Sequence, residues 1–370
     1  METHYLIIGA GPSGLAIAKA LKEADIPYEQ VEASDDVGGN WYHGTYETAN
    51  ILSSRDVMEY PDFPMPDDYP DFPSRAQMHA YYQAYADHFE LRAHIQFQTK
   101  VVFVSPVEDN LWEVRFADGS TRRYRGTLVC NGHHWSKNFP VYEGEFEGET
   151  FHSKDYKTPS QLQGKRVLVI GAGNSGFDIA SAAARVGRAC YLSVRRGIWI
   201  FPKLFMGKPL STFRLALPRF VQMRLAKLML RLTIGNPENY GFPKPTIGIF
   251  DRHPTVDSDT LINIKNGRIK VKGAVKRLTA SGAEFADGSL VEVDTIVYAT
   301  GFKVDFPFLP APLARVEGSV VKVYGYSMYD DYKGLFIIGW FQPRGGVGSL
   351  ITPFAELLVE LLRLQERIET

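Results

Sequence analysis

Two stretches of this chain repeat one pattern of hydrophobic and polar positions. Tyr5-Leu-Ile-Ile8 and Val167-Leu-Val-Ile170 are short, continuous apolar runs, which is typical of strands buried on both faces of a parallel sheet. Each run is followed by a glycine-rich turn, by residues with helical periodicity and by a second apolar run. The pattern predicts an α/β protein with two strand–turn–helix–strand units.

The repetition continues beyond these two units. Phe116-Ala-Asp-Gly-Ser120 recurs as Phe285-Ala-Asp-Gly-Ser289, and each copy is followed, at the same distance, by an apolar run that ends in glycine, at Gly132 and at Gly301. Alternating residues around an Asp-Gly turn predict a small β meander in both places. We therefore expect two copies of one plan, with residues from about 197 to 265 inserted into the second copy.

The rest of the chain is less regular. Residues 46 to 75 are rich in proline, aspartate and aromatic residues, which favours an ordered loop over a disordered linker. The basic amphipathic run from Phe213 to Ile234 is interrupted by charges and proline and cannot span a bilayer. We interpret it as a helix that covers the core or lines an active-site channel, rather than one on a membrane surface. We also expect a helix over 76–89, strands over 95–104 and 335–339, and a helix near Thr352.

Composition narrows the class of protein. The 370 residues allow two or three domains, and a formal net charge of −1 provides no basis for binding nucleic acid or an acidic membrane. Cys130 and Cys190 are far apart, so no Cys-x-x-Cys dithiol of a disulfide reductase is possible. Few cysteines, and a strand that begins at Tyr5 without a preceding targeting peptide, indicate a cytoplasmic protein. His133 and His134 lack a third ligand at suitable spacing, so we expect no metal site.

The first glycine turn, Gly9-Ala-Gly-Pro-Ser-Gly14, carries the chemistry of a dinucleotide site. Gly9 allows the tight turn, Gly11 lets the backbone approach a pyrophosphate, and Gly14 lets the helix lie close to the strand. The start of the helix offers unpaired N–H groups and a positive dipole end to the phosphates. Glu32, eighteen residues after Gly14, would accept hydrogen bonds from a ribose.

The second glycine turn, Gly171-Ala-Gly-Asn-Ser-Gly176, differs from the first at the ribose position. The residue eighteen positions after Gly176 is Val194, and Arg195 and Arg196 follow it. No carboxylate is present there to bind a ribose 2′-hydroxyl or to repel a 2′-phosphate, whereas guanidinium groups pair well with phosphate. These residues predict a site for NADPH rather than NADH.

The segment between the two turns is Phe146-Glu-Gly-Glu-Thr-Phe-His-Ser-Lys-Asp-Tyr-Lys157. Its spacing resembles the signature F-x-G-x-x-x-H-x-x-x-(Y/F) of the flavin-containing monooxygenases, class B flavoprotein monooxygenases related to the Baeyer–Villiger monooxygenases. Val37-Gly-Gly-Asn-Trp41 is similar to the G-G-x-W segment of two-dinucleotide flavoproteins, and Ala299-Thr-Gly-Phe302 resembles the A-T-G segment where such chains return to the FAD domain. The resemblance covers nearly the whole chain.

The resemblance implies two Rossmann-like dinucleotide-binding domains. Residues 1–158 and 299–370 would form a discontinuous FAD-binding domain, and residues 159–298 an NADP-binding domain with a channel-shaping insertion. The FAD site would comprise Gly9, Gly11, Pro12, Ser13, Gly14, Glu32, Gly39, Asn40, Trp41, Val102, Gly301 and Gln342. The NADP site would comprise Gly171, Gly173, Asn174, Ser175, Gly176, Arg195 and Arg196. His152 and Tyr156 would orient the junction between the domains.

The resemblance also implies a reaction. NADPH would reduce the FAD, O2 would add to flavin C4a, and the (hydro)peroxyflavin would transfer one oxygen atom to a small organic substrate. The chemistry belongs to the cofactor, so no protein nucleophile or metal is required. Because the signature ends in Tyr156 rather than in the tryptophan typical of Baeyer–Villiger enzymes, a soft sulfur, nitrogen or electron-rich carbon nucleophile is the first choice. Ketone oxygenation, a peroxide-leaking flavin NADPH oxidase or reductase, and a non-catalytic dinucleotide-binding redox sensor are the alternatives.

One position departs from the family pattern. In the loop that would contribute to the reactive face of the flavin, the family usually has an asparagine where this chain has Leu52. Asn50, Ser53 and Ser54 are polar neighbours, and none of them occupies the matching position. This difference makes the peroxide-leaking alternative more credible. The identity of the substrate and the oligomeric state stay open, with a homodimer as one alternative.

Overall fold

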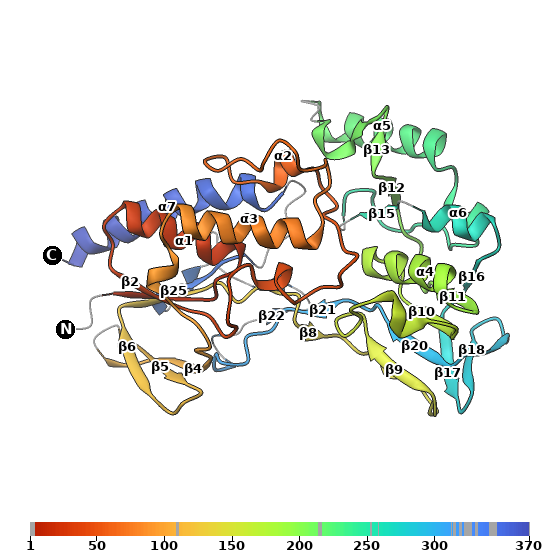
Figure 1. Ribbon diagram of the computed structural model, residues 1–370, viewed down its shortest axis with the longest axis horizontal. Helices are drawn as coiled ribbons and strands as arrows, with labels where there is room; N and C mark the ends of the chain where they lie inside the picture. The colour runs from red at the N-terminus through yellow and green to blue at the C-terminus, as the bar shows by residue number, and fades with distance from the viewer. Residues whose placement is uncertain are drawn as a thin grey trace. The chain divides into compact units, whose positions relative to one another are not determined.

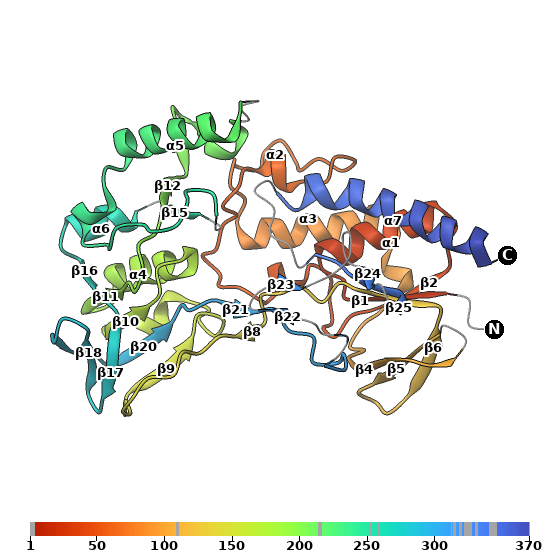
Figure 2. The same ribbon diagram turned by 180° about the vertical axis from the view of Figure 1, so that it is seen from behind.

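The computed structural model divides the chain into two compact units. The first unit comprises Met1–Thr45, Ser53–Ser136 and Phe302–Thr370, and the second comprises Tyr46–Leu52 and Lys137–Gly301. Each unit contains its own sheet of mainly parallel strands, as the hydrophobic pattern predicts (Figures 1 and 2). The described residues are 4–108, 111–213, 217–251, 254–257, 259–311, 313, 316–317, 320–321, 328–329, 332–339 and 346–369.

The first unit is built on a six-stranded sheet in the order β24-β25-β7-β1-β2-β3. Neighbouring strands pair in parallel, except β24 with β25. The strands are β1 (Tyr5–Ile8), β2 (Tyr28–Val31), β3 (Ile95–Gln96), β7 (Gly126–Val129), β24 (Met328–Tyr329) and β25 (Tyr332–Ile337). The predicted return strand over 335–339 is therefore present as β25, beside β7.

Helices cover one face of this sheet and a β meander covers the other (Figure 1). The helices are α1 (Pro12–Glu23), α2 (Arg55–Met58), α3 (Arg75–His88) and α7 (Gly348–Glu369). The meander strands are β4 (Val101–Pro106), β5 (Trp112–Phe116) and β6 (Thr121–Tyr124). Leu6 and Ile8 form an apolar core with Trp112 and Val114, because alternate side chains of β1 point to the same face. Short elements complete the unit: η1 (Gly39–Trp41), η2 (Arg92–His94), β21 (Phe302–Lys303), β22 (Val316–Glu317) and β23 (Val320–Val321).

The second unit repeats the plan with a five-stranded, fully parallel sheet in the order β16-β11-β10-β20-β9. The strands are β9 (Glu149–His152), β10 (Arg166–Ile170), β11 (Ala189–Ser193), β16 (Ile269–Lys272) and β20 (Thr295–Tyr298). The helix α4 (Asn174–Val186) covers one face, and the antiparallel meander β17 (Val275–Thr279), β18 (Gly282–Phe285) and β19 (Leu290–Glu292) covers the other.

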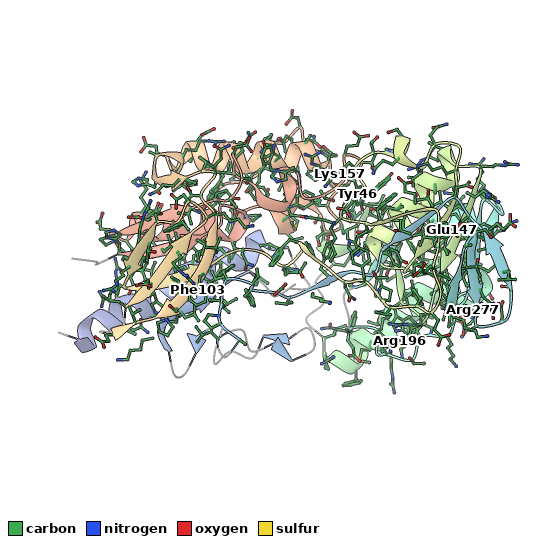
Figure 3. The ribbon with its side chains drawn as sticks, turned by 90° about the horizontal axis from the view of Figure 1, so that it is seen from below. Tyr46, Phe103, Glu147, Lys157, Arg196 and Arg277 are labelled. Carbon is green, nitrogen blue, oxygen red and sulfur yellow. The ribbon has the colours of Figure 1, made fainter. Side chains whose placement is uncertain are left out.

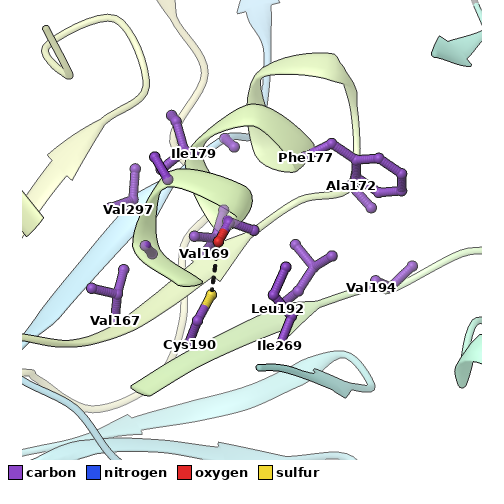
Figure 4. Packing of buried hydrophobic residues seen from close by; sticks show 14 of the residues in the cluster. Val167, Val169, Ala172, Phe177, Ile179, Cys190, Leu192, Val194, Ile269 and Val297 are labelled. Atoms are coloured by element: carbon purple, nitrogen blue, oxygen red, sulfur yellow. Dashed lines mark hydrogen bonds between the residues drawn. The ribbon is translucent and has the colours of Figure 1, made fainter. Parts of the chain in front are cut away.

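The alternation of side chains along β10 separates two apolar cores. Val167 and Val169 pack toward α4, in a cluster that includes Phe177 and Leu192 (Figure 4). Their neighbours Leu168 and Ile170 pack instead with the residues of the meander. The continuous apolar run therefore reflects a strand buried on both faces, as the sequence predicts.

The insertion in the second unit forms small sheets and helices. They are β12 (Ile200–Pro202), β13 (Leu204–Phe205), β14 (Lys208–Pro209), η5 (Leu210–Thr212), α5 (Arg219–Thr233), η6 (Pro237–Tyr240), β15 (Thr255–Asp257) and α6 (Thr260–Lys265). The basic run after Phe213 thus forms the helix α5. Among the described residues, no helix is both long enough and apolar enough to cross a membrane.

Two predicted elements differ from the structure. The single strand expected over 95–104 is divided into β3 and β4, because the chain turns at Gln98, which has a positive φ of 53°. The sequence predicts no strand in the segment 146–157, but β9 forms there and pairs in parallel with β20 at the edge of the second sheet. The second unit consequently begins at Lys137 and includes Gly301, rather than starting at residue 159 and ending at 298.

Candidate functional site

The first glycine turn lies at the carboxyl end of β1. Gly9 has a φ of +107°, and a Cβ atom there would lie 2.6 Å from the carbonyl oxygen of Cys130. A Cβ atom on Gly14 would lie 2.0 Å from the carbonyl oxygen of Gly9. Both positions therefore require glycine, because a side chain would overlap the backbone.

The start of α1 is suited to bind an anion. The helix begins at Pro12, with Ser13 next and with Gly11 as its N-cap, and among the described residues no side chain caps it. Its first N–H groups can therefore bind phosphate oxygens. Gly39 approaches this point, since a Cβ atom on Gly39 would lie 3.1 Å from Cα of Gly11. Because both residues are glycines, no side chain lies at this point, where a pyrophosphate would bind.

Glu32 comes directly after β2 and is joined to the glycine turn. One oxygen of its carboxylate accepts a hydrogen bond from the N–H of Ala10 at 2.7 Å, and the other accepts from the N–H and the hydroxyl of Ser34 at 2.9 and 2.7 Å. A carboxylate has about four acceptor positions, and three are occupied, so it can still accept from a ribose hydroxyl. Gln30 also supports the turn, because its buried amide donates to the carbonyl oxygen of Gly9 at 3.0 Å.

The second glycine turn repeats this geometry at the carboxyl end of β10. Gly171 has a φ of +113°, and a Cβ atom on Gly176 would lie 2.1 Å from the carbonyl oxygen of Gly171. Gly173 is the N-cap of α4, and among the described residues no side chain caps this helix either. A Cβ atom on Gly173 would meet no described atom within 4 Å. The space beside the helix N-terminus is therefore open to a ligand.

Two of the predicted NADP residues have other partners. The side chain of Asn174 donates to the carbonyl oxygen of Pro254 at 3.2 Å and accepts from the N–H of Val256 at 2.7 Å. Its amide thus fastens the start of α4 to β15. Ser175 lies beside the hydroxyl of Tyr46, with which it forms a hydrogen bond. Their backbone N–H groups, rather than these side chains, suit a phosphate.

The residues after β11 differ from those after β2. Val194 is 2% exposed and belongs to the core around α4. Arg195 and Arg196 are both exposed, and Figure 3 shows Arg196 at the surface of this unit. Two guanidinium groups thus stand where the first unit has a carboxylate.

His152 holds the turn that follows β20. The N–H of Lys154 donates to Nδ1 of His152 at 3.1 Å, so the proton of the neutral ring is on Nε2, which donates to the carbonyl oxygen of Gly301 at 3.0 Å. Burial lowers the pKa of His152, which favours this neutral form. Gly301 lies in the second unit, shortly after Ala299, whose carbonyl oxygen would lie 2.3 Å from a Cβ atom on Gly171. Gly132 follows Cys130, the corresponding neighbour of Gly9, in the first unit.

The other residues of the signature are structural. A Cβ atom on Gly148 would lie 2.3 Å from the ring of Phe146, which packs against the meander core. Tyr156 is 1% exposed, and burial raises its pKa to about 12. These contacts place the signature within the second unit.

The remaining predicted residues are distributed over both units. Asn50 is exposed and Leu52 is half-buried, both in the second unit, whereas Ser53 and the 1% exposed Ser54 belong to the first. Asn40 and Trp41 lie in η1, and Val102 is 43% exposed on β4. Gln342 lies outside the described residues.

Sequence reasoning missed three residues of this arrangement. Gln30, which is fully buried, carries only a weak signal, because it lies two positions before the acid in a strand that also contains Glu29. Gly132 is marked by the repeat, as the partner of Gly301. Asp178, which accepts a hydrogen bond from Tyr46 at 2.5 Å, has no such signal, because its partner is distant in the sequence.

Comparisons with known proteins agree with this geometry. The family model described as flavin-binding monooxygenase-like matches residues 3–362. Dimethylaniline monooxygenase (N-oxide-forming) 2 of Oryctolagus cuniculus is 33% identical over 94% of this chain and 71% of its own length. Flavin-containing monooxygenase 5 of Homo sapiens is 34% identical over 96% of this chain and 72% of its own length. A solved structure of the OTEMO complex with FAD and NADP is 18% identical and covers 99% of this chain and 85% of that chain, with a TM-score of 0.78, which shows a shared fold.

Proposed function

Because the chain belongs to the flavin-binding monooxygenase-like family and is an FAD-dependent NADPH monooxygenase, we propose that its substrate is a small organic molecule with a soft sulfur, nitrogen or electron-rich carbon nucleophile. The reaction balances as NADPH, H⁺, O2 and substrate giving NADP⁺, water and oxygenated substrate. The observation that carries the proposal is the family match over nearly the whole chain, which includes a relative named for N-oxide formation.

The two turns fit the two cofactors differently. Bound FAD, once reduced by NADPH, supplies the activation of O2. We assign FAD to the first unit, where Glu32 would bind the ribose and the N-terminus of α1 the pyrophosphate. The second unit would hold NADPH, with the N-terminus of α4 at its pyrophosphate and Arg195 at its 2′-phosphate. The support is the carboxylate bound to Ala10 in the first unit and the exposed arginine in the second.

The test begins with the purified protein without oxygen. Addition of NADPH should bleach the flavin absorbance. Such bleaching would exclude a non-catalytic redox sensor. Admission of O2 with thioanisole or N,N-dimethylaniline should then yield sulfoxide or N-oxide, at close to one product for each NADPH. Product from cyclohexanone but from neither heteroatom substrate would favour ketone oxygenation and contradict our choice.

Leu52 favours a second candidate function, a flavin NADPH oxidase that releases hydrogen peroxide. An apolar side chain cannot donate the hydrogen bond that an asparagine could at this position. Hydrogen peroxide close to one equivalent for each NADPH, with no oxygenated product, would support the oxidase. A cytoplasmic location and a homodimer stay predictions from the sequence.

A further inference from the structure

A short segment of the chain belongs to a different unit from its neighbours. Tyr46–Leu52 lies in the second unit, although Thr45 before it and Ser53 after it lie in the first. Tyr46 and Ala49 are each 6% exposed and belong to the apolar core around α4. The segment is therefore part of the second unit by its packing, and not merely close to it.

A partly buried hydrogen bond fastens the start of this segment. The hydroxyl of Tyr46 donates to Oδ2 of Asp178 at 2.5 Å. Asp178 lies in α4, two residues after the last glycine of the second turn, Gly176. Burial raises the pKa of Asp178, and the hydroxyl of Tyr46 stabilises its charged form. Removal of this hydroxyl would leave a partly buried carboxylate with one partner fewer.

Backbone and ring contacts hold the same segment on the signature residues. The N–H of Glu47 donates to the carbonyl oxygen of Lys157 at 2.9 Å, and Tyr46 and Lys157 lie side by side in Figure 3. The ring of Tyr46 lies 5.4 Å from the ring of Tyr156. The N–H of Ala49 donates to the carbonyl oxygen of Tyr46 at 3.1 Å, which turns the chain toward residue 50.

The residues that follow are anchored within the first unit. Ser54 is 1% exposed and precedes α2. The guanidinium of Arg55 donates to the carbonyl oxygens of Pro66, Asp67 and Tyr69 at 2.9, 3.1 and 3.0 Å. Asn50 and Leu52 therefore lie in the second unit, and the residues directly after them have their contacts within the first.

We propose that Tyr46 and Asp178 are positioning residues for oxygen transfer. Their hydrogen bond fixes the start of the loop with Asn50 and Leu52, and it joins that loop to the helix that begins at the predicted NADP site. The inference rests on the proposed function, because the loop influences the reaction only if it lies at the flavin. A loosened loop admits water, and admission of water favours release of hydrogen peroxide over oxygen transfer.

The first experiment replaces Tyr46 by phenylalanine in the FAD-loaded protein. It measures amide hydrogen exchange and the coupling of NADPH oxidation to oxygen transfer, taken as the hydrogen peroxide released per NADPH. A hydrogen bond to a charged group is worth about tenfold or more in an equilibrium. We expect about tenfold faster exchange of the Glu47 and Ala49 amides, and a several-fold rise in hydrogen peroxide per NADPH with thioanisole as substrate. The matched control is Tyr124→Phe, which removes a hydroxyl bound to Glu29 at 2.8 Å in the first unit and should leave both readouts unchanged.

The second experiment varies the acceptor. Asp178→Asn keeps an acceptor oxygen for the hydroxyl of Tyr46 and should keep exchange and coupling near those of the parent protein. Asp178→Ala should reproduce Tyr46→Phe, and the double variant should be no worse than either single variant, since both remove one bond.

The outcomes separate this inference from the proposed function. A parent protein that oxygenates neither thioanisole nor N,N-dimethylaniline contradicts the proposed function. A coupled parent protein with unchanged peroxide release in Tyr46→Phe overturns the positioning role, whether or not exchange changes. Equal increases in Tyr124→Phe would also overturn it, because the effect would then reflect any lost tyrosine hydrogen bond.

Discussion

The two nucleotide-binding units share one backbone plan and differ where the second strand ends. The N–H of Gly9 donates to the carbonyl oxygen of Val31 at 2.8 Å, and the N–H of Gly171 donates to that of Ser193 at 3.0 Å. After these equivalent positions, the first unit has a carboxylate bound to its glycine turn and the second has buried Val194. The backbones of the two turns are thus similar, and the side chain that follows the second strand differs between the units.

The difference extends into the strand itself. Gln30, two residues before Glu32, is fully buried and donates to the carbonyl oxygen of Gly9. Leu192, two residues before Val194, is also fully buried but packs in the apolar core around α4. The first unit therefore supports its turn and its acid with polar groups. The second has Leu192 and Val194 in its apolar core, and two exposed arginines follow them.

The largest expected effect comes from a reciprocal pair of substitutions. Gly11 and Gly173 have φ values of −75° and −80°, so leucine is not strained at either position. Gly11→Leu would place a side chain in the pyrophosphate path of the first unit, and we expect almost colourless protein by absorbance. Gly173→Leu should instead keep its flavin and lose NADPH binding by titration.

This pair can contradict the assignment directly. Normal flavin content in Gly11→Leu, or loss of flavin in Gly173→Leu, would mean that the cofactors are assigned to the wrong units. Gly173→Leu also serves as the folding control, because its side chain would enter open space.

The next largest effect concerns the ribose position of the second unit. Arg195→Ala should weaken NADPH binding by about ten- to over a hundredfold, since a charge-assisted hydrogen bond contributes about 1.5–3 kcal/mol. NADH affinity and flavin content should stay unchanged, because only NADPH has the 2′-phosphate. Arg196→Ala is the comparison variant, and we expect a smaller loss of NADPH affinity from it than from Arg195→Ala. Equal losses for NADPH and NADH would indicate that the arginine supports the fold instead.

The acid sensitivity of each unit provides a third test. Burial lowers the pKa of His152 in the second unit and of His133 in the first. The folded state therefore binds fewer protons than the unfolded state, whose histidine pKa is about 6.5. Each neutral histidine therefore contributes its full share to the free energy of unfolding above about pH 6.5. This contribution decreases as the pH falls from there toward the pKa of the folded state, by up to about 1.4 kcal/mol per pH unit for each histidine.

Urea unfolding at pH 7.5 and 5.5 measures this effect. His152→Gln keeps a donor and an acceptor but does not titrate, so its loss of stability on acidification should be smaller than that of the parent protein. His133→Gln tests the first unit in the same way. A pH dependence that neither substitution reduces would assign the sensitivity to other groups.

The smallest expected effect concerns Leu52. An asparagine there could form a hydrogen bond worth about 0.5–1.5 kcal/mol, which corresponds to roughly two- to tenfold in a rate. Leu52→Asn should therefore lower the hydrogen peroxide released per NADPH by a factor in that range. The measurement is peroxide yield with and without thioanisole, and Leu52→Ala is the control that changes size without adding a donor. Equal peroxide from both variants would contradict a hydrogen-bonding role for this position.

Local patterns predicted the parts of the fold that depend on neighbouring residues. The apolar runs, the glycine turns and the repeated Phe-Ala-Asp-Gly-Ser segments correspond to β1, β10 and the two meanders. The same patterns could not show that β9 pairs with β20, since a four-residue strand of mixed polarity has no clear period. The assignments of individual residues to FAD and NADPH stay predictions.

The sequence by itself determined the two-fold α/β plan, the two anion-binding turns and the contrast between Glu32 and Val194, because these depend on residue type and short spacing. Only the tertiary structure decided that residues 46–52 belong to the second unit and that Tyr46 binds Asp178. It also placed Ala299 beside Gly171 and joined His152 to Gly301 by a hydrogen bond. The physical reason is that such bonds join residues more than a hundred positions apart in the sequence, and burial in a shared core, rather than any local pattern, brings them together.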